Sequence, residues 1–203
     1  MKSIKKTSIL TFAFAFLALQ AIALSEAWEL AKEKNAIKVY TRTSSSSTLK
    51  DSKAMVSLPV NPSKVIEFLN DFDNYPTWMH KCSKAKLLKK ASDMEYYVYM
   101  VIDSPWPVSD RDLISHVTAT EKSDGTIILD MKSAPDFIPK KDGIVRITDF
   151  EGFWKIMPTK QHNVDLIYQF HTDPAGNIPN WMANSTAVDI PFFTLENMKK
   201  QVR

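Results

Sequence analysis

The segment with the most chemical content is a proline-flanked run that ends in an Arg-Asp pair. Residues 105–113 read Pro-Trp-Pro-Val-Ser-Asp-Arg-Asp-Leu, and a strand-like run follows. Each proline fixes its own φ, lacks a backbone donor and pushes the residue before it toward extended geometry. The connector is therefore stiff, and it delivers the Arg111 guanidinium and the Asp112 carboxylate to the start of a strand. Both charges need partners if that strand is buried.

Three other side chains could move protons, namely Asp103, His116 and Tyr99. General acid–base catalysis requires a pair of such groups that reaches one buried substrate. Nothing in the spacing of these three brings them together. The chain also carries no Gly-x-Ser-x-Gly elbow, no His-Glu-x-x-His motif and no phosphate loop. We therefore predict no catalytic residues, and a binding protein rather than an enzyme.

Cys82 is the one cysteine of the chain. It could be a reactive thiol or form an intermolecular bridge, but no His or Asn motif flanks it, which favours a small packed side chain. His80 lies two residues away, and a lone His-x-Cys pair is a weak metal signal. We predict no metal site and no cofactor.

The N-terminal residues have the pattern of a secretory signal peptide. Three lysines lie within the first six residues, an uncharged apolar run covers 9–19, and small residues surround Ala23. An uncleaved membrane anchor is the alternative, but the apolar run is shorter than the roughly 20 residues that a spanning helix needs. We predict that residues 1–23 are a signal peptide cleaved near Ala23, and that the protein is periplasmic or secreted.

The charge balance argues against a nucleic-acid partner. The chain has 26 Lys+Arg and 23 Asp+Glu, and the predicted signal peptide contains three of the lysines and no acidic residue. The remaining chain is therefore formally neutral and lacks the excess of basic residues that nucleic-acid binding requires. Its length suits one domain with a sizeable core, which we expect to be a monomer.

Hydrophobic periodicity predicts an α+β domain. A short amphipathic helix is expected over 25–34, and Asn61-Pro62 marks the start of a helix that ends near Asn70. A second short helix begins at Tyr75, and a long helix covers 180–200 with Pro191 inside it, where a kink or break is expected. Strands are expected over 37–43, 53–58, 84–90, 94–103, 113–121, 126–133, 144–157 and 163–172.

The run at 105–113 closely resembles the signature of START domains, the StAR-related lipid-transfer modules. Further segments are similar to that family in the same order, although each is weak alone. The resemblance implies an α+β helix-grip fold over residues 24–203, in which a curved antiparallel sheet grips the long C-terminal helix. The supporting segments are 61–65 with 75–78, 138–146, 152–156 and 173–181.

The resemblance also implies binding, and transfer, of a hydrophobic ligand such as a lipid in a cavity between sheet and helix. Strand alternation places Leu113, Ser115 and Val117 on one face, which we assign to that cavity. Pockets for such ligands are typically about 300–1,000 Å³. A filled core is the alternative from the pattern alone. The expected ligand-binding residues are Met100, Arg111, Leu113, Ser115, Val117, Leu129, Met131, Leu166, Tyr168, Trp181, Asn184, Val188 and Phe192.

Two points of ligand chemistry stay open. In some phospholipid-carrying relatives the signature arginine contacts the lipid phosphate, so Arg111 has either that role or an ion pair with a neighbouring carboxylate. Sterol-binding relatives place a second arginine where this chain has Val117, which favours an apolar ligand or an acyl chain. The alternative function is an enzyme of the polyketide cyclase/aromatase type, since such enzymes are similar to START domains.

We expect the ligand to pass through a gate formed by Phe137 and Ile138, in the loop 134–142, and by the Pro191 kink. Apolar residues are unusual in such a loop, and Lys140 and Lys141 could meet anionic headgroups in a transient contact with a membrane surface. The alternative is that Phe137 and Ile138 fasten the loop onto the core.

Overall fold

The computed structural model describes residues 27–43, 47–160, 163–176 and 178–202. The predicted signal peptide lies outside these residues. Strands and helices follow one another in an α+β arrangement, as the sequence indicated. The elements are β1 (Glu29–Lys34), β2 (Ile37–Thr43), β3 (Lys50–Leu58), α2 (Pro62–Asn70), the 3₁₀ helix η1 (Phe72–Asn74), α3 (Tyr75–Trp78), β4 (Cys82–Ser92), β5 (Glu95–Ile102), β6 (Arg111–Glu121), β7 (Ile127–Ser133), β8 (Val145–Arg146), β9 (Asp149–Pro158), β10 (Val164–Asp173) and α4 (Asn180–Gln201).

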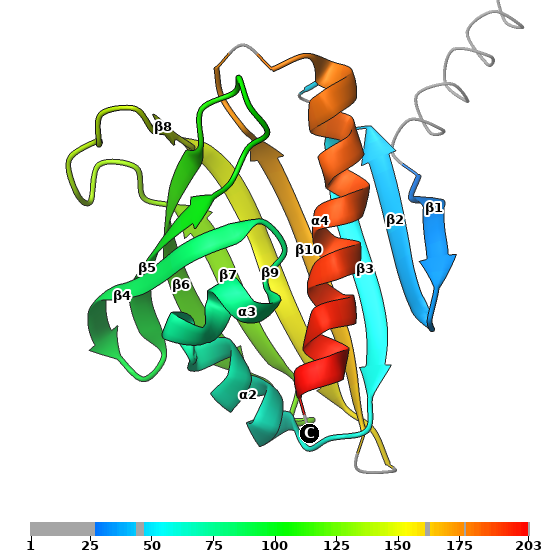
Figure 1. The fold of residues 1–203 in the computed structure, drawn as a ribbon. Helices are drawn as coiled ribbons and strands as arrows, with labels where there is room; N and C mark the ends of the chain where they lie inside the picture. Colours follow the sequence, from blue (N-terminus) through cyan, green and yellow to red (C-terminus); the bar gives the residue numbers. More distant parts are fainter. Residues whose placement is uncertain (1–26, 44–46, 161–162, 177, 203) are drawn as a thin grey trace, which may run out of the picture.

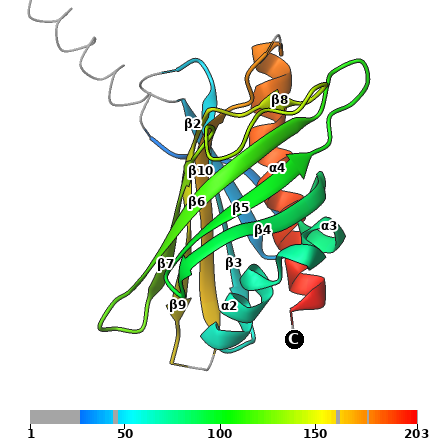
Figure 2. The same ribbon diagram turned by 90° about the vertical axis from the view of Figure 1, so that its left-hand side faces the viewer.

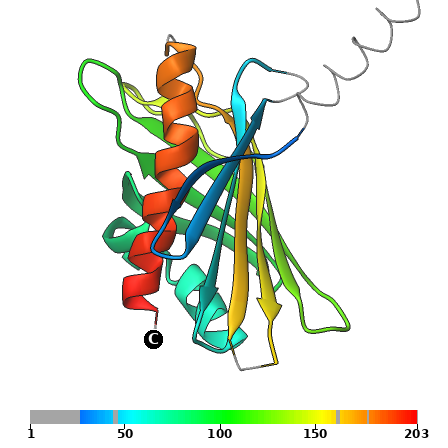
Figure 3. The same ribbon diagram turned by 90° about the vertical axis from the view of Figure 1, so that its right-hand side faces the viewer.

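The ten strands form one curved sheet in the order β1-β2-β3-β10-β9-β7-β6-β5-β4, with β8 beside β6. Every pairing along this path is antiparallel, and only β8 pairs in parallel, with β6. The helix α4 lies along the inner side of the sheet, and α2 and α3 cover the same side near its lower end (Figure 1). Figure 3 shows α4 beside β2 and β3, and Figure 2 shows the outer side of β4 to β7. The fold thus confirms the expected sheet around a C-terminal helix.

Side chains alternate between the two faces of the sheet, as the strand pattern predicted. Leu113, Ser115 and Val117 of β6 are all buried on the inner face, beside Met100 and Met131 of the neighbouring strands. The rings of Trp154 and Tyr168 pair across β9 and β10 with centroids 4.0 Å apart. The main core lies on this face, between the sheet and the helices.

Three details differ from the sequence prediction. The helix expected over 25–34 is wrong, because Glu29–Lys34 is an edge strand that turns into β2 through Asn35 and Ala36, both at positive φ. Leu30 of this strand is 52% exposed, so the segment does not bury an apolar helix face. Its conformation is set by the pairing with β2. The expected strand 144–157 is split into β8 and β9. Pro191 lies inside α4 without breaking it.

Among the described residues, no helix is long and apolar enough to cross a membrane.

Candidate ligand-binding pocket

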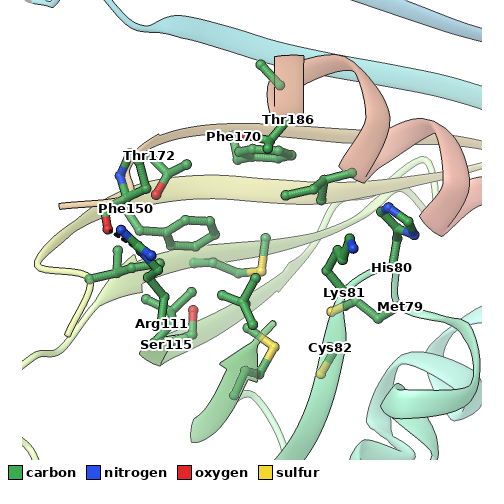
Figure 4. Close-up of a pocket in the computed structure, with 18 of the residues that line it drawn as sticks. Met79, His80, Lys81, Cys82, Arg111, Ser115, Phe150, Phe170, Thr172 and Thr186 are labelled. Carbon is green, nitrogen blue, oxygen red and sulfur yellow. Dashed lines mark hydrogen bonds between the residues drawn. The ribbon is translucent and has the colours of Figure 1, made fainter. Parts of the chain in front are cut away.

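A cavity of about 200 Å³ lies between the inner face of the sheet and the N-terminal half of α4. Most of its wall is apolar. It is supplied mainly by β5, β6, β7, β9 and β10 and by α4, with further residues from α2, η1, α3 and the loops at the ends of the sheet. Figure 4 shows Arg111 and Ser115 toward one end, and Met79, His80 and Cys82 toward the other. The volume is below the range of about 300–1,000 Å³ that we expected for a lipid-sized ligand.

Most of the residues expected to bind ligand lie on the wall of this cavity. They come from β5, β6, β7 and β10 and from α4, and the strand side chains share the inner face because strand residues two apart point the same way. Their part in binding stays a prediction. The wall includes Met100, Arg111, Leu113, Ser115, Val117, Leu129, Met131, Tyr168 and Asn184.

Four expected residues do not line the cavity. Leu166 points inward but is packed in the core with 1% exposure. On α4, Trp181 is 71% exposed, Val188 packs against the core, and Phe192 is buried under the Lys32 side chain. Three of the four residues expected from the helix, Trp181, Val188 and Phe192, belong to its apolar stripe, and only the polar Asn184 lines the pocket. The other residues on the pocket side of α4 are Met182, Ala183, Thr186, Ala187 and Ile190, most of which are small or polar.

Several wall residues were missed in the sequence. Tyr96, Val98 and Met100 are two residues apart on β5 and therefore share one face, so the period of two could have identified the first two. Phe150, Trp154 and Phe170 add aromatic side chains to the wall. They come from β9 and β10, where the alternation of apolar and polar residues is less clear in the sequence. Met79 and the loop residues Pro105, Val108 and Ile178 carry no local signal of a pocket.

Arg111 is 4% exposed and its guanidinium is bound by neutral acceptors. Nε donates to the Pro174 carbonyl and Nη2 to the Ala175 carbonyl, both at 3.2 Å. Nη1 donates to Ser104 Oγ at 3.3 Å and to the Ser109 carbonyl. None of these acceptors is a carboxylate, and burial lowers the pKa of Arg111, with Asp110 opposing that effect. A guanidinium has five N–H donors, so within the described chain one Nη2 hydrogen stays available.

Ser115 lies one inward step beyond Leu113 on the same strand, with 1% exposure. Its Oγ has no hydrogen-bond partner among the described residues. A buried hydroxyl without a partner costs free energy, on the order of 1–3 kcal/mol. Ser115 and the free donor of Arg111 therefore offer two unsatisfied polar groups to whatever occupies the cavity.

Asp112, the carboxylate next to Arg111 in the sequence, forms its ion pair with Arg146. Asp112 points to the outer face, where its carboxylate accepts from Arg146 Nε at 2.6 Å and from Nη2 at 3.0 Å. Both side chains are 1% exposed. Asp110, the neighbouring carboxylate on the other side of Arg111, accepts from the Ser104 backbone N–H at 2.9 Å. Of the two roles left open for Arg111, an ion pair with Asp112 or Asp110 is not found among the described residues. Strand alternation sends residues 111 and 112 to opposite faces, and Asp110 bonds the Ser104 backbone instead.

The same outer face holds the loop that we had assigned to the gate. Arg146 donates to the carbonyls of Pro135, Ile138 and Pro139. Phe137 stacks on Tyr97 at 4.1 Å, and Ile138 joins the small outer cluster. The loop therefore lies across the sheet from α4, and the gate assigned to Phe137, Ile138 and Pro191 meeting each other is wrong. The contacts of Phe137 and Ile138 agree with the alternative, in which these two residues fasten the loop onto the rest of the domain.

The end of the pocket near Arg111 is formed by two loops. Ser104, Pro105 and Val108 come from the β5–β6 loop, and Pro174 and Ile178 from the β10–α4 loop. Arg111 joins the two loops through its hydrogen bonds. Figures 1 to 3 place the β5–β6 loop and the N-terminal end of α4 at the same end of the molecule.

Two tryptophans project from this end. Trp106, in the β5–β6 loop, is 93% exposed, and Trp181, in the first turn of α4, is 71% exposed. Large exposed aromatic side chains are unusual on a soluble surface and are typical of contact surfaces with a partner or a membrane interface.

The three possible proton-transfer groups are separated. Asp103 lies on the pocket wall, whereas Tyr99 and His116 lie on the outer face, where His116 contacts Glu95 at 2.8 Å. Cys82 is buried on the wall, and burial raises the pKa of its thiol to about 11. Within the described segments, no group of three or more His, Cys, Asp and Glu residues is placed to hold a metal ion.

Comparison with known proteins agrees with this geometry. The pattern of the START domain matches residues 15–203. The chain belongs to the START domain family. The crystal structure of a STAR-related lipid transfer protein from Xanthomonas axonopodis superposes with a TM-score of 0.82, at 38% identity over 88% of this chain and 99% of that one.

Two sequence relatives extend the comparison. An uncharacterised protein of Pseudomonas aeruginosa is 34% identical over 98% of this chain and 97% of its own length. The phosphatidylcholine transfer protein of Mus musculus is 25% identical over 89% of this chain and 87% of its own. Of these three proteins, the two whose names state an activity are lipid transfer proteins.

Proposed function

We propose that this START domain binds one lipid in the pocket between its sheet and α4 and carries it between membranes. The observation that carries the proposal is an apolar cavity with an arginine and an unpartnered serine on its wall. Apolar-lined pockets with a few placed polar groups are typical of sites for hydrophobic ligands. The lipid-transfer relatives support the same function.

The polar end of the lipid would lie beside Arg111 and Ser115. Arg111 keeps one N–H donor and a positive charge that no carboxylate neutralises directly, and Ser115 Oγ lacks a partner in the described chain. A phosphate or carboxylate accepts strong hydrogen bonds from a guanidinium. The acyl chain would then run along Leu113, Val117 and Met131.

Trp106 and Trp181 would dock this end of the molecule on a bilayer. Indole rings sit at the headgroup level of membranes because one part is apolar and the N–H is polar. Docking there would bring the β5–β6 and β10–α4 loops, which border the pocket, against the lipid source.

Native mass spectrometry of the purified protein, mixed with phospholipid vesicles, tests the proposal. We expect one lipid per protein, and transfer of a fluorescent phospholipid between two vesicle populations. Arg111→Leu should abolish phospholipid binding and leave a neutral apolar probe bound, with Asp130→Asn on the outer face as the control variant. Absence of any bound lipid and of transfer would overturn the carrier function. Unchanged phospholipid binding by Arg111→Leu would overturn only the polar subsite.

Export is part of the proposal and is supported by the N-terminal sequence pattern. N-terminal sequencing of the protein recovered from a periplasmic fraction should begin near Leu24. A protein that retains its first residues and stays with the cytoplasmic fraction would contradict export.

A further inference from the structure

The two halves of α4 are held in different ways. After residue 190 the helix buries Phe192, Leu195 and Met198, each at 2% exposure or less. Two side chains of this half also bond to the α3 region, since Thr194 Oγ1 accepts from the His80 N–H and Asn197 donates to the Trp78 carbonyl. The C-terminal half is therefore part of the core.

The N-terminal half, residues 180–190, contributes only Ala187 to the fully buried set. Val188 and Ile190 pack against the core while only partly buried, and the other attachments are single polar contacts. Asn180 bonds Thr48 at 2.9 Å, Asn184 accepts from the Lys50 N–H at 3.0 Å, and an exposed Asp189 pairs with Lys32 at 3.3 Å. All the residues of α4 that line the pocket come from this half. It is thus held by fewer buried apolar side chains than the C-terminal half of the helix.

Pro191 stands at the boundary between the two halves. In a helix the N–H of residue 191 would bond the carbonyl of residue 187, but proline has no N–H. A buried carbonyl that loses its donor is costly unless another group replaces it. Ser52 of β3 does so, since its Oγ donates to the Ala187 carbonyl at 2.5 Å, and Ser52 is fully buried. One serine of the sheet therefore supplies the bond that the proline removes from the helix.

We propose that Pro191 is a hinge, that residues 180–190 are a lid over the pocket, and that Ser52 is the latch that holds the lid closed. The ligand role of the lid rests on the proposed function. A cavity of about 200 Å³ must enlarge to hold a lipid. Release of the Ser52–Ala187 bond lets the weakly anchored half move while the C-terminal half stays in the core.

The test compares Ser52→Ala with Ser57→Ala, which removes a hydroxyl from the same strand where it contacts Asp165 and not α4. Hydrogen exchange of the ligand-free protein is measured by mass spectrometry. We expect exchange in 182–190 to be roughly tenfold faster in Ser52→Ala, which is the effect of one lost buried hydrogen bond, with 192–201 unchanged. Ser57→Ala should leave both segments unchanged.

A second variant checks the role of the proline. Ser52→Ala/Pro191→Ala restores a backbone N–H that can bond the Ala187 carbonyl, so the protection of 182–190 should return toward wild type. The uptake rate of the neutral fluorophore 1-N-phenylnaphthylamine should rise in Ser52→Ala and fall again in the double variant.

Unchanged exchange in 182–190 of Ser52→Ala, or a loss of protection spread over the whole chain, would overturn the hinge. Faster exchange with an unchanged uptake rate would show that the segment moves but is not the lid. Because exchange is measured without ligand, failure of the carrier function would leave the hinge result intact.

Discussion

Asp112→Asn tests the contribution of the buried ion pair on the outer face. The carboxylate receives two hydrogen bonds from Arg146, at 2.6 and 3.0 Å, and both side chains are 1% exposed. The bond to Asp112 raises the pKa of the Arg146 guanidinium, against the opposing effect of burial. Asparagine has nearly the same shape but no charge, so the substitution leaves a buried cation without its anion.

Removal of one partner from a buried pair costs about 3–5 kcal/mol. For a domain of this size each kcal/mol lowers Tm by about 2–4 °C, so Asp112→Asn should lower Tm by roughly 6–20 °C. The loop 134–142 should lose protection at the same time, because Arg146 also holds its carbonyls. The pocket lies on the other face, so the affinity for a neutral apolar probe should stay the same.

Urea unfolding, followed by tryptophan fluorescence and circular dichroism, measures the change in the free energy of unfolding. Asp130→Asn is the control, since Asp130 is an exposed acid on the next strand of the same face, and it should stay within about 0.5 kcal/mol of wild type. The double variant Asp112→Leu/Arg146→Met removes both charges and should be more stable than Asp112→Asn. A loss below about 1 kcal/mol for Asp112→Asn would refute the argument that this pair is buried and mutually dependent.

Further predictions concern the backbone, the thiol and the exposed rings. Gly152→Ala should lose about 1–3 kcal/mol in urea unfolding, because its Cβ would lie 2.5 Å from the Gln169 carbonyl oxygen; an unchanged midpoint would contradict this close approach. The Cys82 thiol should react slowly with a disulfide reagent at pH 8 and faster as the pH nears 11, since burial raises its pKa and keeps it neutral; fast reaction at pH 8 would refute its burial. The same raised pKa contributes stability below about pH 9 that is lost as the pH rises toward 11. Trp106→Ala and Trp181→Ala should leave Tm nearly unchanged and weaken sedimentation with phospholipid vesicles, and full vesicle binding by the double variant would exclude these rings as the docking site.

Strand alternation could be predicted from the sequence because it is a local property of the chain. The assignment of Leu113, Ser115 and Val117 to one inner face needed only the period of two and the apolar character of the run. The start of α2 at Asn61-Pro62 was likewise readable from the local preferences of these residues. The stiff run before Arg111 and the similarity of several segments to START domains predicted the fold family.

The pairing of elements could not be predicted in the same way. Residues 29–34 have an amphipathic pattern, yet they form a strand because β2 offers an edge to pair with. The sequence shows that Phe137 and Ile138 are apolar, but not on which face of the sheet they lie. Their place on the outer face depends on Arg146, which bonds the Ile138 carbonyl and pairs with Asp112 there.

The sequence by itself determined which residues alternate, where α2, α3 and α4 begin, and that an arginine and an aspartate enter a buried strand together. Only the tertiary structure decided which partners those two charges have, which side of α4 faces the pocket, and that Ser52 bonds the carbonyl opposite Pro191. The physical reason is that periodicity is set by neighbours along the chain. The partner of a buried charge or an unpaired carbonyl, in contrast, comes from whichever distant segment the sheet brings beside it.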